Sequence, residues 1–266
     1  MTTSTSQDHW FIFQNDALVL LNEGQSLPNH KDIASIKPYF IRQFKIGFWN
    51  NTDYYCAEIN QTQGLSEVFQ TIPLRQALSA LDDEKFGLSV KAHSVLNWDK
   101  NHRFCGRCGG HTEHQTKGFE RTCLSCGLSF FPRISPSIIV LIKKGDQLLM
   151  ARGPHFLPGV YGLIAGFVEP GENLEETVHR EVKEEVGIAI KNLTYVCSQP
   201  WPFPDSLMVA FTADYASGDI VIDNDEIEEA GWYRYNALPG RPSTATSVSA
   251  KLIDAFVAGF DNNSVR

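Results

Sequence analysis

The sequence predicts an α+β protein whose three regions differ in composition. Residues 1–99 show short strand-like runs followed by two helical patterns, whereas residues 100–131 are rich in cysteine, glycine and polar residues. Residues 132–266 alternate strand-like runs with helical patterns. Because 266 residues are enough for more than one domain, we expect a smaller N-terminal α+β domain, a cysteine-rich module and a larger C-terminal domain of helices on a mixed sheet.

The N-terminal region holds four runs of apolar and aromatic residues and then two stretches with helical periodicity. The runs predict strands over residues 9–13, 17–21, 44–49 and 54–59. The periodic stretches predict helices over residues 74–81 and 85–96.

The middle region has no periodic apolar pattern, so its side chains cannot build a core and it needs another source of stability. Two CxxC pairs, Cys105 with Cys108 and Cys123 with Cys126, are separated by 14 residues, close to the spacing of ribbon-type zinc sites. Four thiolates leave no position open for water, which predicts a structural Zn²⁺. Redox chemistry is the alternative for one CxxC pair, but two pairs at this distance favour the metal.

The C-terminal region begins with an apolar run over residues 137–142, and residues 147–152 pair with it across a turn at Lys144-Gly145-Asp146. Further strands are predicted over residues 161–165, 193–197, 207–213 and 220–222. Helices are predicted over residues 174–186 and 249–260.

The helix over residues 174–186 has clear signals at both ends. Asn173 is a suitable N-cap with Glu176 three positions on, and Gly187 stands where a helix C-terminus favours a left-handed residue. An apolar stripe with a spacing of four docks the helix on a sheet and comprises Leu174, Val178, Val182 and Val186.

Glu181, Glu184 and Glu185 project from another face of this helix. Like charges at this spacing repel one another, but oxygen-rich clusters suit hard cations such as Mg²⁺ or Mn²⁺, which polarise phosphate oxygens and activate water. A charged, solvated helix face is the alternative interpretation. It leaves unexplained the glycine loop before the helix, the Arg-Glu pair within it and the glycine after it.

The helix and its preceding loop resemble the Nudix box at every defining position, in the string Gly166-x5-Glu172-x7-Arg180-Glu181-Val182-x-Glu184-Glu185-x-Gly187-Ile188. The resemblance implies a Nudix α/β/α sandwich with a mixed sheet and cleavage of a nucleoside diphosphate linked to another moiety. It implies that Arg180 and Glu172 are structural and hold the loop on the helix.

The same resemblance implies catalytic roles for individual residues. Glu181 and Glu185 bind metal, and Glu184 binds metal or acts as a base. The backbone carbonyl of Ala165 is a further ligand, and Glu226 supplies one more carboxylate. Asp225 and Glu228 are the alternatives to Glu226, and a polar turn without function is the plain interpretation of that segment.

The segment over residues 198–206 contains three prolines, which stiffen the chain around Trp201 and Phe203. Aromatic rings held beside Gln and Ser suit a flat heteroaromatic ligand. A loop that merely covers the edge of the core is the alternative. The segment resembles the SQPWPFPxS signature of bacterial and eukaryotic NADH pyrophosphatases, also known as NAD-capped RNA hydrolases.

This second resemblance extends over most of the chain and implies a set of substrate-binding residues. They are Arg75, Phe131, Gln199, Pro200, Trp201, Pro202, Phe203, Pro204, Asp205, Ser206 and Ser249. The chain departs from the pattern at one point, because Phe131-Pro132 stands where bacterial members carry Tyr-Pro. Stacking survives that change, whereas a hydrogen bond from the hydroxyl group does not.

The resemblance implies an enzyme that cuts the pyrophosphate of NAD(H), giving NMN(H) and AMP, and that removes NAD caps from RNA 5′ ends. It also implies a homodimer. A Nudix hydrolase of ADP-ribose or dinucleoside polyphosphates is the alternative enzyme. A zinc-ribbon nucleic-acid-binding protein with an inactive Nudix fold is the alternative of another class, and the intact glutamates argue against it.

Charge and hydropathy limit the partners further. The net charge of −8 argues against broad electrostatic binding to nucleic acid, although bound metal ions still permit a nucleotide substrate. We expect no membrane span, and the polar first seven residues lack the features of a secretory signal, so a cytoplasmic location is expected. Cys56 and Cys197 are then expected to be ordinary buried thiols.

Overall fold

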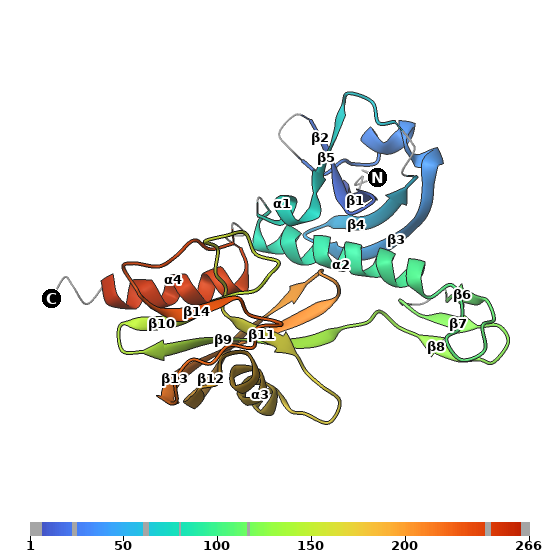
Figure 1. The fold of residues 1–266 in the computed structure, drawn as a ribbon. Helices are drawn as coiled ribbons and strands as arrows, with labels where there is room; N and C mark the ends of the chain where they lie inside the picture. Colours follow the sequence, from blue (N-terminus) through green and yellow to red (C-terminus); the bar gives the residue numbers. More distant parts are fainter. Residues whose placement is uncertain are drawn as a thin grey trace. The chain divides into compact units, whose positions relative to one another are not determined.

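In the computed structural model the chain forms two compact units, Met1–Arg133 and Ile134–Arg266 (Figure 1). The predicted N-terminal and cysteine-rich regions both lie in the first unit. The structure describes residues 7–22, 26–60, 64–79, 81–115, 118–242 and 246–261. Within these residues, no helix has both the length and the apolar character required to span a lipid bilayer.

The first unit contains a five-stranded sheet in the order β3-β4-β1-β2-β5, in which β1 and β4 are parallel. Its strands are β1 (Gln7–Gln14), β2 (Ala17–Leu21), β3 (Phe40–Trp49), β4 (Thr52–Ile59) and β5 (Phe69–Pro73). Its helical elements are η2 (Asp32–Ser35), η3 (Lys37–Tyr39), α1 (Leu74–Leu78) and α2 (Asp83–Asn101). The four predicted strands and two predicted helices are confirmed, but α1 ends at Leu78 and β5 was not predicted.

A small ribbon completes the first unit and consists of β6 (Thr112–His114), β7 (Arg121–Cys123) and β8 (Ser129–Phe130). The buried Arg121 ties it together, because its guanidinium donates to Thr112 Oγ1 at 2.8 Å and to the Thr112 carbonyl at 2.7 Å. The same guanidinium pairs with Asp99 near the end of α2. The ribbon is thereby anchored to the last turns of α2 by charge.

The second unit is built on a six-stranded mixed sheet in the order β12-β13-β9-β10-β14, with β11 also paired to β9. Strands β9 and β13 are parallel and the other pairs are antiparallel. The strands are β9 (Ser135–Lys144), β10 (Gln147–Arg152), β11 (Ile164–Phe167), β12 (Ala189–Trp201), β13 (Ser206–Ser217) and β14 (Glu229–Arg234).

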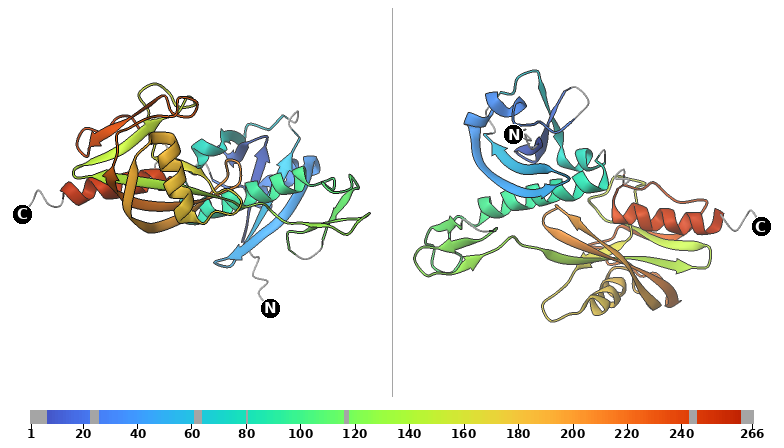
Figure 2. Two further views of the ribbon diagram at one scale, coloured as in Figure 1. Left: turned by 60° about the horizontal axis from the view of Figure 1, so that its bottom comes forward. Right: turned by 180° about the vertical axis from the view of Figure 1, so that it is seen from behind.

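One helix covers each face of this sheet, as both views in Figure 2 show. Helix α3 (Leu174–Val186) packs its apolar stripe against one cluster of buried strand residues, which includes Ile138 and Val140. Helix α4 (Val248–Asp261) packs against a second cluster on the other face, which includes Ile139 and Leu141. Successive side chains of β9 point to opposite faces of the sheet and therefore contribute to both clusters. The predicted α/β/α sandwich is confirmed.

Helix α3 begins and ends where the sequence predicts. Asn173 accepts from the backbone N–H of Glu176 at 2.9 Å, and the Glu176 carboxylate accepts from the N–H of Asn173, which forms a capping box. Gly187 ends the helix at a φ of 76°. These ends fix which residues of α3 face the sheet and which face the site.

Two predictions for this unit need correction, and one strand was not predicted. The strand expected over 161–165 begins at Ile164, because the residues before it make only isolated bridges. Residues 220–222 are not a strand: the Val221 N–H bonds to the Val186 carbonyl at the end of α3 instead. Strand β14, which was not predicted, pairs with the whole length of β10.

Candidate active site

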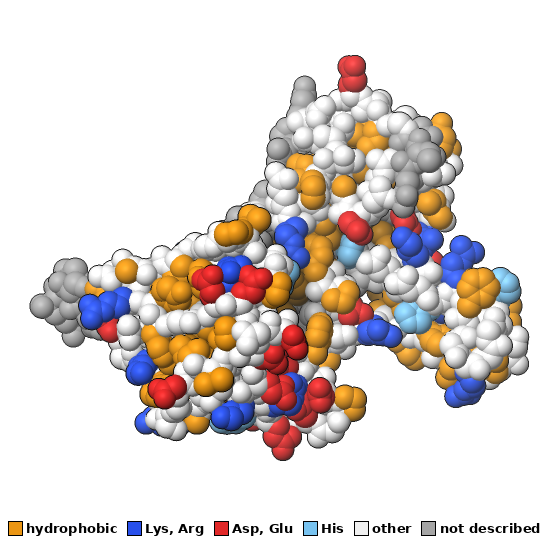
Figure 3. All heavy atoms as spheres, in the orientation of Figure 1, with side chains coloured by type: hydrophobic (Ala, Val, Ile, Leu, Met, Phe, Trp, Pro, Cys, Tyr) orange, Lys and Arg blue, Asp and Glu red, His pale blue; other side chains and the backbone are white. Residues whose placement is uncertain are grey.

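Three carboxylates converge at one end of the second unit. Glu181 and Glu185 come from α3, and Glu226 comes from the loop before β14. One oxygen of each lies within 4.8 Å of the others. Glu181 and Glu185 are each only 7% exposed, whereas Glu226 is exposed, so the group opens to solvent on one side. Acidic side chains gather over α3 and the loop before it in Figure 3.

The position of Glu226 follows from backbone hydrogen bonds at the end of α3. The N–H of Asp223 donates to the Glu185 carbonyl at 3.2 Å, one residue before the end of the helix. The Asp223 carbonyl then accepts from the N–H of Ile227 at 2.8 Å, which closes a turn around Glu226. A residue 41 positions along the chain from Glu185 is therefore brought to its side chain.

Burial and charge make the three carboxylates an unfavourable group on their own. Burial, followed by the negative charges of Glu181 and Glu226, raises the pKa of Glu185 to about 8. Burial also raises the pKa of Glu181. A divalent cation would reverse this preference by stabilising the ionised carboxylates, and its ligands in such a site are hard oxygens. The donor set therefore fits Mg²⁺ or Mn²⁺.

Gly166 lies against the Glu181 carboxylate and leaves no room for a side chain. A Cβ atom at this position would lie 2.0 Å from the Glu181 carboxyl carbon. The strand itself is held in register with β9, and the Ser137 hydroxyl donates to the Gly166 carbonyl at 2.8 Å. A side chain at position 166 would therefore displace the Glu181 carboxylate.

Arg180 joins the loop, the helix and the carboxylate group. It donates to Glu172 at 2.5 and 2.9 Å and to the Phe167 carbonyl at 3.0 Å. Its Nη1 donates to Glu181 at 2.9 Å and to Glu184 at 3.0 Å. Hydrogen bonds from Arg180 lower the pKa of Glu172 to about 2, so this anchor stays ionised near neutral pH. Both residues have the structural contacts expected of them.

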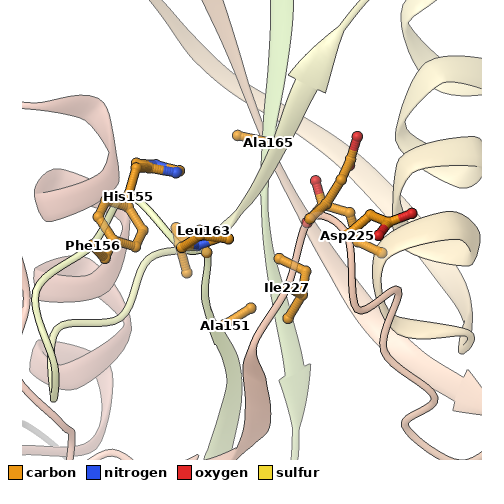
Figure 4. A pocket seen from close by; sticks show the side chains of 11 residues that line it. Ala151, His155, Phe156, Leu163, Ala165, Asp225 and Ile227 are labelled. Carbon is orange, nitrogen blue, oxygen red and sulfur yellow. The ribbon is translucent and has the colours of Figure 1, made fainter.

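A pocket of about 480 Å³ opens beside the carboxylates. His155 and Phe156 line one side, and Asp225 and Ile227 line the other, as Figure 4 shows. Ala165 stands at the edge of the same space, and Glu185 and Glu226 contribute to its lining. The pocket lies in the size range of small-molecule sites and presents an aromatic wall opposite an acidic one.

The proline-rich segment forms a hairpin between β12 and β13. Trp201 pairs with Ser206 in the sheet, and the rings of Trp201 and Phe203 meet edge to face at 5.6 Å. Asp205 closes the hairpin on β9, because its carboxylate accepts from the Ser135 hydroxyl at 2.9 Å. Trp201 and Phe203 are half-buried and Pro204 is exposed. The hairpin is therefore held in a defined position while its rings stay accessible.

Gln199 connects this hairpin to α4. Its side-chain amide donates to the Thr246 carbonyl at 2.8 Å, and its oxygen accepts from the Val248 N–H at 2.7 Å. The residue is buried, and both groups of its amide are used in fixing the start of α4. Ser249 follows directly in that helix and is half-buried.

In the first unit, the four cysteines of the CxxC pairs bring their sulfurs within 4.8 Å of one another. Cys105 and Cys126 have their sulfurs 3.6 Å apart, and those of Cys108 and Cys123 are 3.5 Å apart. A tetrahedral zinc with Zn–S bonds of about 2.3 Å requires roughly 3.8 Å between sulfurs, so the geometry fits. The backbone N–H of Cys126 lowers the pKa of Cys123 to about 6, which favours the thiolate that zinc binds.

Comparison with known families accounts for nearly the whole chain. Residues 7–98 match the NADH pyrophosphatase-like rudimentary NUDIX domain, residues 100–131 the NADH pyrophosphatase zinc ribbon domain, and residues 132–256 the NUDIX domain. A NAD-capped RNA hydrolase NudC from Chromobacterium violaceum is 49% identical over 92% of this chain and 90% of its own length. Its counterpart in Pseudomonas aeruginosa is 45% identical over 80% of this chain and 76% of its own.

The chain belongs to the NADH pyrophosphatase (NAD-capped RNA hydrolase) family of Nudix hydrolases. The family resemblance stated from the two motifs is thereby confirmed. So is the prediction of a zinc ribbon between two larger domains.

The structure brings some of the predicted site residues together and leaves others apart. One space is surrounded by Ala165, Glu181, Glu185 and Glu226. Glu184 lies outside this group and is 57% exposed, and it shares Arg180 as a hydrogen-bond partner with Glu181. The hairpin residues and Ser249 share the second unit with the carboxylates. The two remaining candidates lie in the first unit: an exposed Arg75 on α1 and a 60% exposed Phe131.

Sequence reasoning missed two residues of the pocket, and it also passed over Phe167 at the end of β11. Phe167 follows Gly166, is 50% exposed and presents an aromatic ring at the end of β11. His155 and Phe156 line the pocket from a loop. The signal for Phe167 was its place directly after the glycine of the box, whereas the loop has a Gly-Pro turn dipeptide but no motif that points to a ligand. Cys197 was also misjudged, because it is only half-buried, unlike Cys56.

Substitution of Gly166 by alanine tests the close approach of β11 to α3. Glu181 must move away from the added methyl group, and a displacement of about 1 Å costs on the order of 100-fold in turnover. We expect Gly166→Ala to lose about that much kcat while it keeps a cooperative thermal transition. Gly87→Ala is the matched control, because no atom lies within 4 Å of its added Cβ. Equal kcat in both variants would show that the approach has no catalytic role.

Metal analysis tests the cysteine site. We expect about one zinc per chain, because four thiolates saturate the tetrahedral ion. Cys105→Ser should lose zinc and lower the thermal stability, whereas Cys197→Ser, outside the cluster, should keep both. A native protein without zinc, whose four CxxC thiols react freely with a thiol reagent, would contradict the assignment.

Proposed function

We propose that the protein hydrolyses the pyrophosphate bond of NAD(H), giving NMN(H) and AMP. The same cut at an NAD-capped RNA releases NMN and leaves a 5′-phosphate on the RNA. The observation that carries the proposal is the convergence of Glu181, Glu185 and Glu226 beside a pocket of ligand size. The choice of substrate is supported by the relatives, which are named NAD-capped RNA hydrolases.

Glu181, Glu185 and Glu226 are the proposed ligands of Mg²⁺ or Mn²⁺, and the backbone carbonyl of Ala165 is a fourth oxygen at the same edge. Such a cation supplies positive charge for the phosphate oxygens and promotes ionisation of the attacking water. The fit rests on the oxygen donors and on their mutual repulsion, which a cation relieves.

The carboxylates of the chain itself supply the proton acceptor. Water attacks one phosphorus atom, its proton passes to Glu185 or Glu184, and the bond from that phosphorus to the bridging oxygen breaks. The bridging oxygen leaves with the other phosphate. Arg180 keeps the glutamates oriented, since one of its nitrogens bonds to both Glu181 and Glu184.

Residues 199–206 are the proposed recognition segment, with Trp201 and Phe203 as the ring-contacting side chains. Gln199 contributes by holding the segment to α4, which places Ser249 near it. Arg75 and Phe131 complete the set on the strength of the family resemblance. Stacking on these rings would hold a flat heteroaromatic ligand, and the hydrogen-bonding groups of the segment would set its orientation.

The remaining features of the proposal concern the whole molecule. We assign residues 1–99, 100–131 and 132–266 to three domains, and a structural Zn²⁺ to the four CxxC cysteines. A cytoplasmic location is supported by the four clustered thiols, which a reducing compartment keeps available for metal. A homodimer is supported by family membership, and light scattering of the purified protein tests it.

Product analysis tests the reaction. With Mg²⁺ or Mn²⁺ present, NADH should yield NMNH and AMP, and a short NAD-capped RNA should yield NMN and 5′-phosphate RNA. Glu185→Gln should lower the turnover of both by orders of magnitude, since an amide is a poor ligand for a hard cation. Glu175→Gln, an exposed position on the same helix, should keep normal turnover. Near-normal turnover of Glu185→Gln at saturating metal would remove Glu185 from the centre.

A comparison of two substrates tests the recognition segment. Trp201→Ala removes a stacking partner, worth about 1–3 kcal/mol, so kcat/KM for NADH should fall roughly 5- to 150-fold. Cleavage of ADP-ribose should fall much less, because ADP-ribose lacks the nicotinamide ring that NADH carries. Trp49→Ala, which removes a 57% exposed Trp from β3, is the control and should spare both substrates. Equal losses on both substrates in Trp201→Ala would make the hairpin a structural cover only.

A further inference from the structure

The tip of the zinc ribbon carries a continuous exposed surface that neither the metal site nor the ribbon core uses. Phe104 and His111 form an isolated bridge and their rings lie 4.7 Å apart. The His111 carbonyl in turn accepts from the N–H of Leu124 at 3.0 Å, which brings the second CxxC segment alongside. Phe104 is 60% exposed, Leu124 is 62% exposed, and His111 is exposed as well.

These apolar side chains are not needed to fold the ribbon. The ribbon is held by the four sulfurs, by the buried Arg121 and by ring contacts of Trp98 with His114 and Phe119, so a polar residue at the position of Phe104 or Leu124 would cost the fold little. Large apolar groups grouped on a surface, rather than scattered singly, indicate a binding surface. These aromatic and aliphatic side chains are therefore available for contact with a partner.

The partner is negatively charged. Arg103 and Arg107 flank Phe104 and are exposed, and neither forms an ion pair with any other residue in the described ranges. Residues 100–131 contain five Lys or Arg residues and two Asp or Glu residues, in a chain whose net charge is −8. Hydrophobic, basic and His side chains lie beside one another on the ribbon, at the right of Figure 3.

An exposed aromatic ring with exposed arginines one residue before it and three residues after it matches the chemistry of a single strand of nucleic acid. Unpaired bases stack on exposed rings, and the phosphates between them pair with arginine, without preference for sequence. A protein partner would find two unpaired like charges beside a small apolar area, which is a poor complement.

We propose that the ribbon-tip surface, formed by Arg103, Phe104, Arg107, His111 and Leu124, binds the single-stranded RNA that follows an NAD cap. The proposal rests on the proposed function and deepens it, because it assigns the polynucleotide part of the substrate to the zinc ribbon. Free NADH lacks that part and makes no use of the surface. Discrimination between capped RNA and the free dinucleotide then resides in the first unit rather than at the carboxylates.

The test compares NADH with a short NAD-capped single-stranded RNA. Phe104→Ala should lower kcat/KM for the capped RNA by at least about 5-fold, the lower end expected for loss of one stacked base, and leave kcat/KM for NADH unchanged. The double variant Arg103→Glu, Arg107→Glu should weaken binding of a fluorescent 5′-phosphate RNA and flatten its dependence on salt concentration. Phe48→Ala, which removes an equally exposed Phe from β3, should change neither.

Each contrary result has a distinct meaning. Equal loss on NADH and capped RNA, or unchanged affinity for RNA in the double arginine variant, overturns the proposal while the proposed function stands. A changed oligomeric state in Phe104→Ala with unchanged affinity for RNA makes the surface a protein interface and also overturns it. Failure of the wild-type protein to cleave either substrate defeats the proposed function itself. If Phe104→Ala loses zinc, the double arginine variant decides.

Discussion

Electrostatic repulsion among Glu181, Glu185 and Glu226 is the constraint around which the second unit is arranged. Their oxygens lie within 4.8 Å of one another, two of them on buried side chains, which an unconstrained chain would avoid. The scaffold imposes the arrangement by backbone means: a capped helix, a strand without a side chain at Gly166 and a turn bonded to the last residues of α3. The folded core thus holds a group of charges ready for a cation.

The second unit and the zinc ribbon solve the problem of stability differently. The second unit buries two apolar clusters, one on each face of its sheet, and can therefore hold strained polar groups at its edge. The ribbon is small and is held by other means. It relies on four sulfurs and on a buried arginine that joins it to α2 through Asp99. Because Phe104 and Leu124 take no part in these contacts, the ribbon can carry them on its surface.

The sequence predicts those parts of the fold that local chemistry determines. Asn173 and Gly187 end α3 by their own backbone and side-chain preferences, so its limits and the face that carries Glu181 and Glu185 could be predicted. Strand β14 lacks an alternating pattern of burial, and its identity depends on pairing with β10 about 80 residues earlier. The apolar residues 220–222 looked like a strand, yet their backbone is bonded to a helix end.

The candidate site shows the same division, since the spacing along one helix identified Glu181 and Glu185 but gave no account of why Glu226 meets them. The hydrogen bonds of Gln199 have a further consequence for the hairpin. Both ends of its amide bond to backbone groups at the start of α4, so the proline-rich hairpin and the last helix are held together as one rigid element. A chimera that received the hairpin from another Nudix hydrolase without its matching C-terminal helix would inherit the rings but lose their alignment.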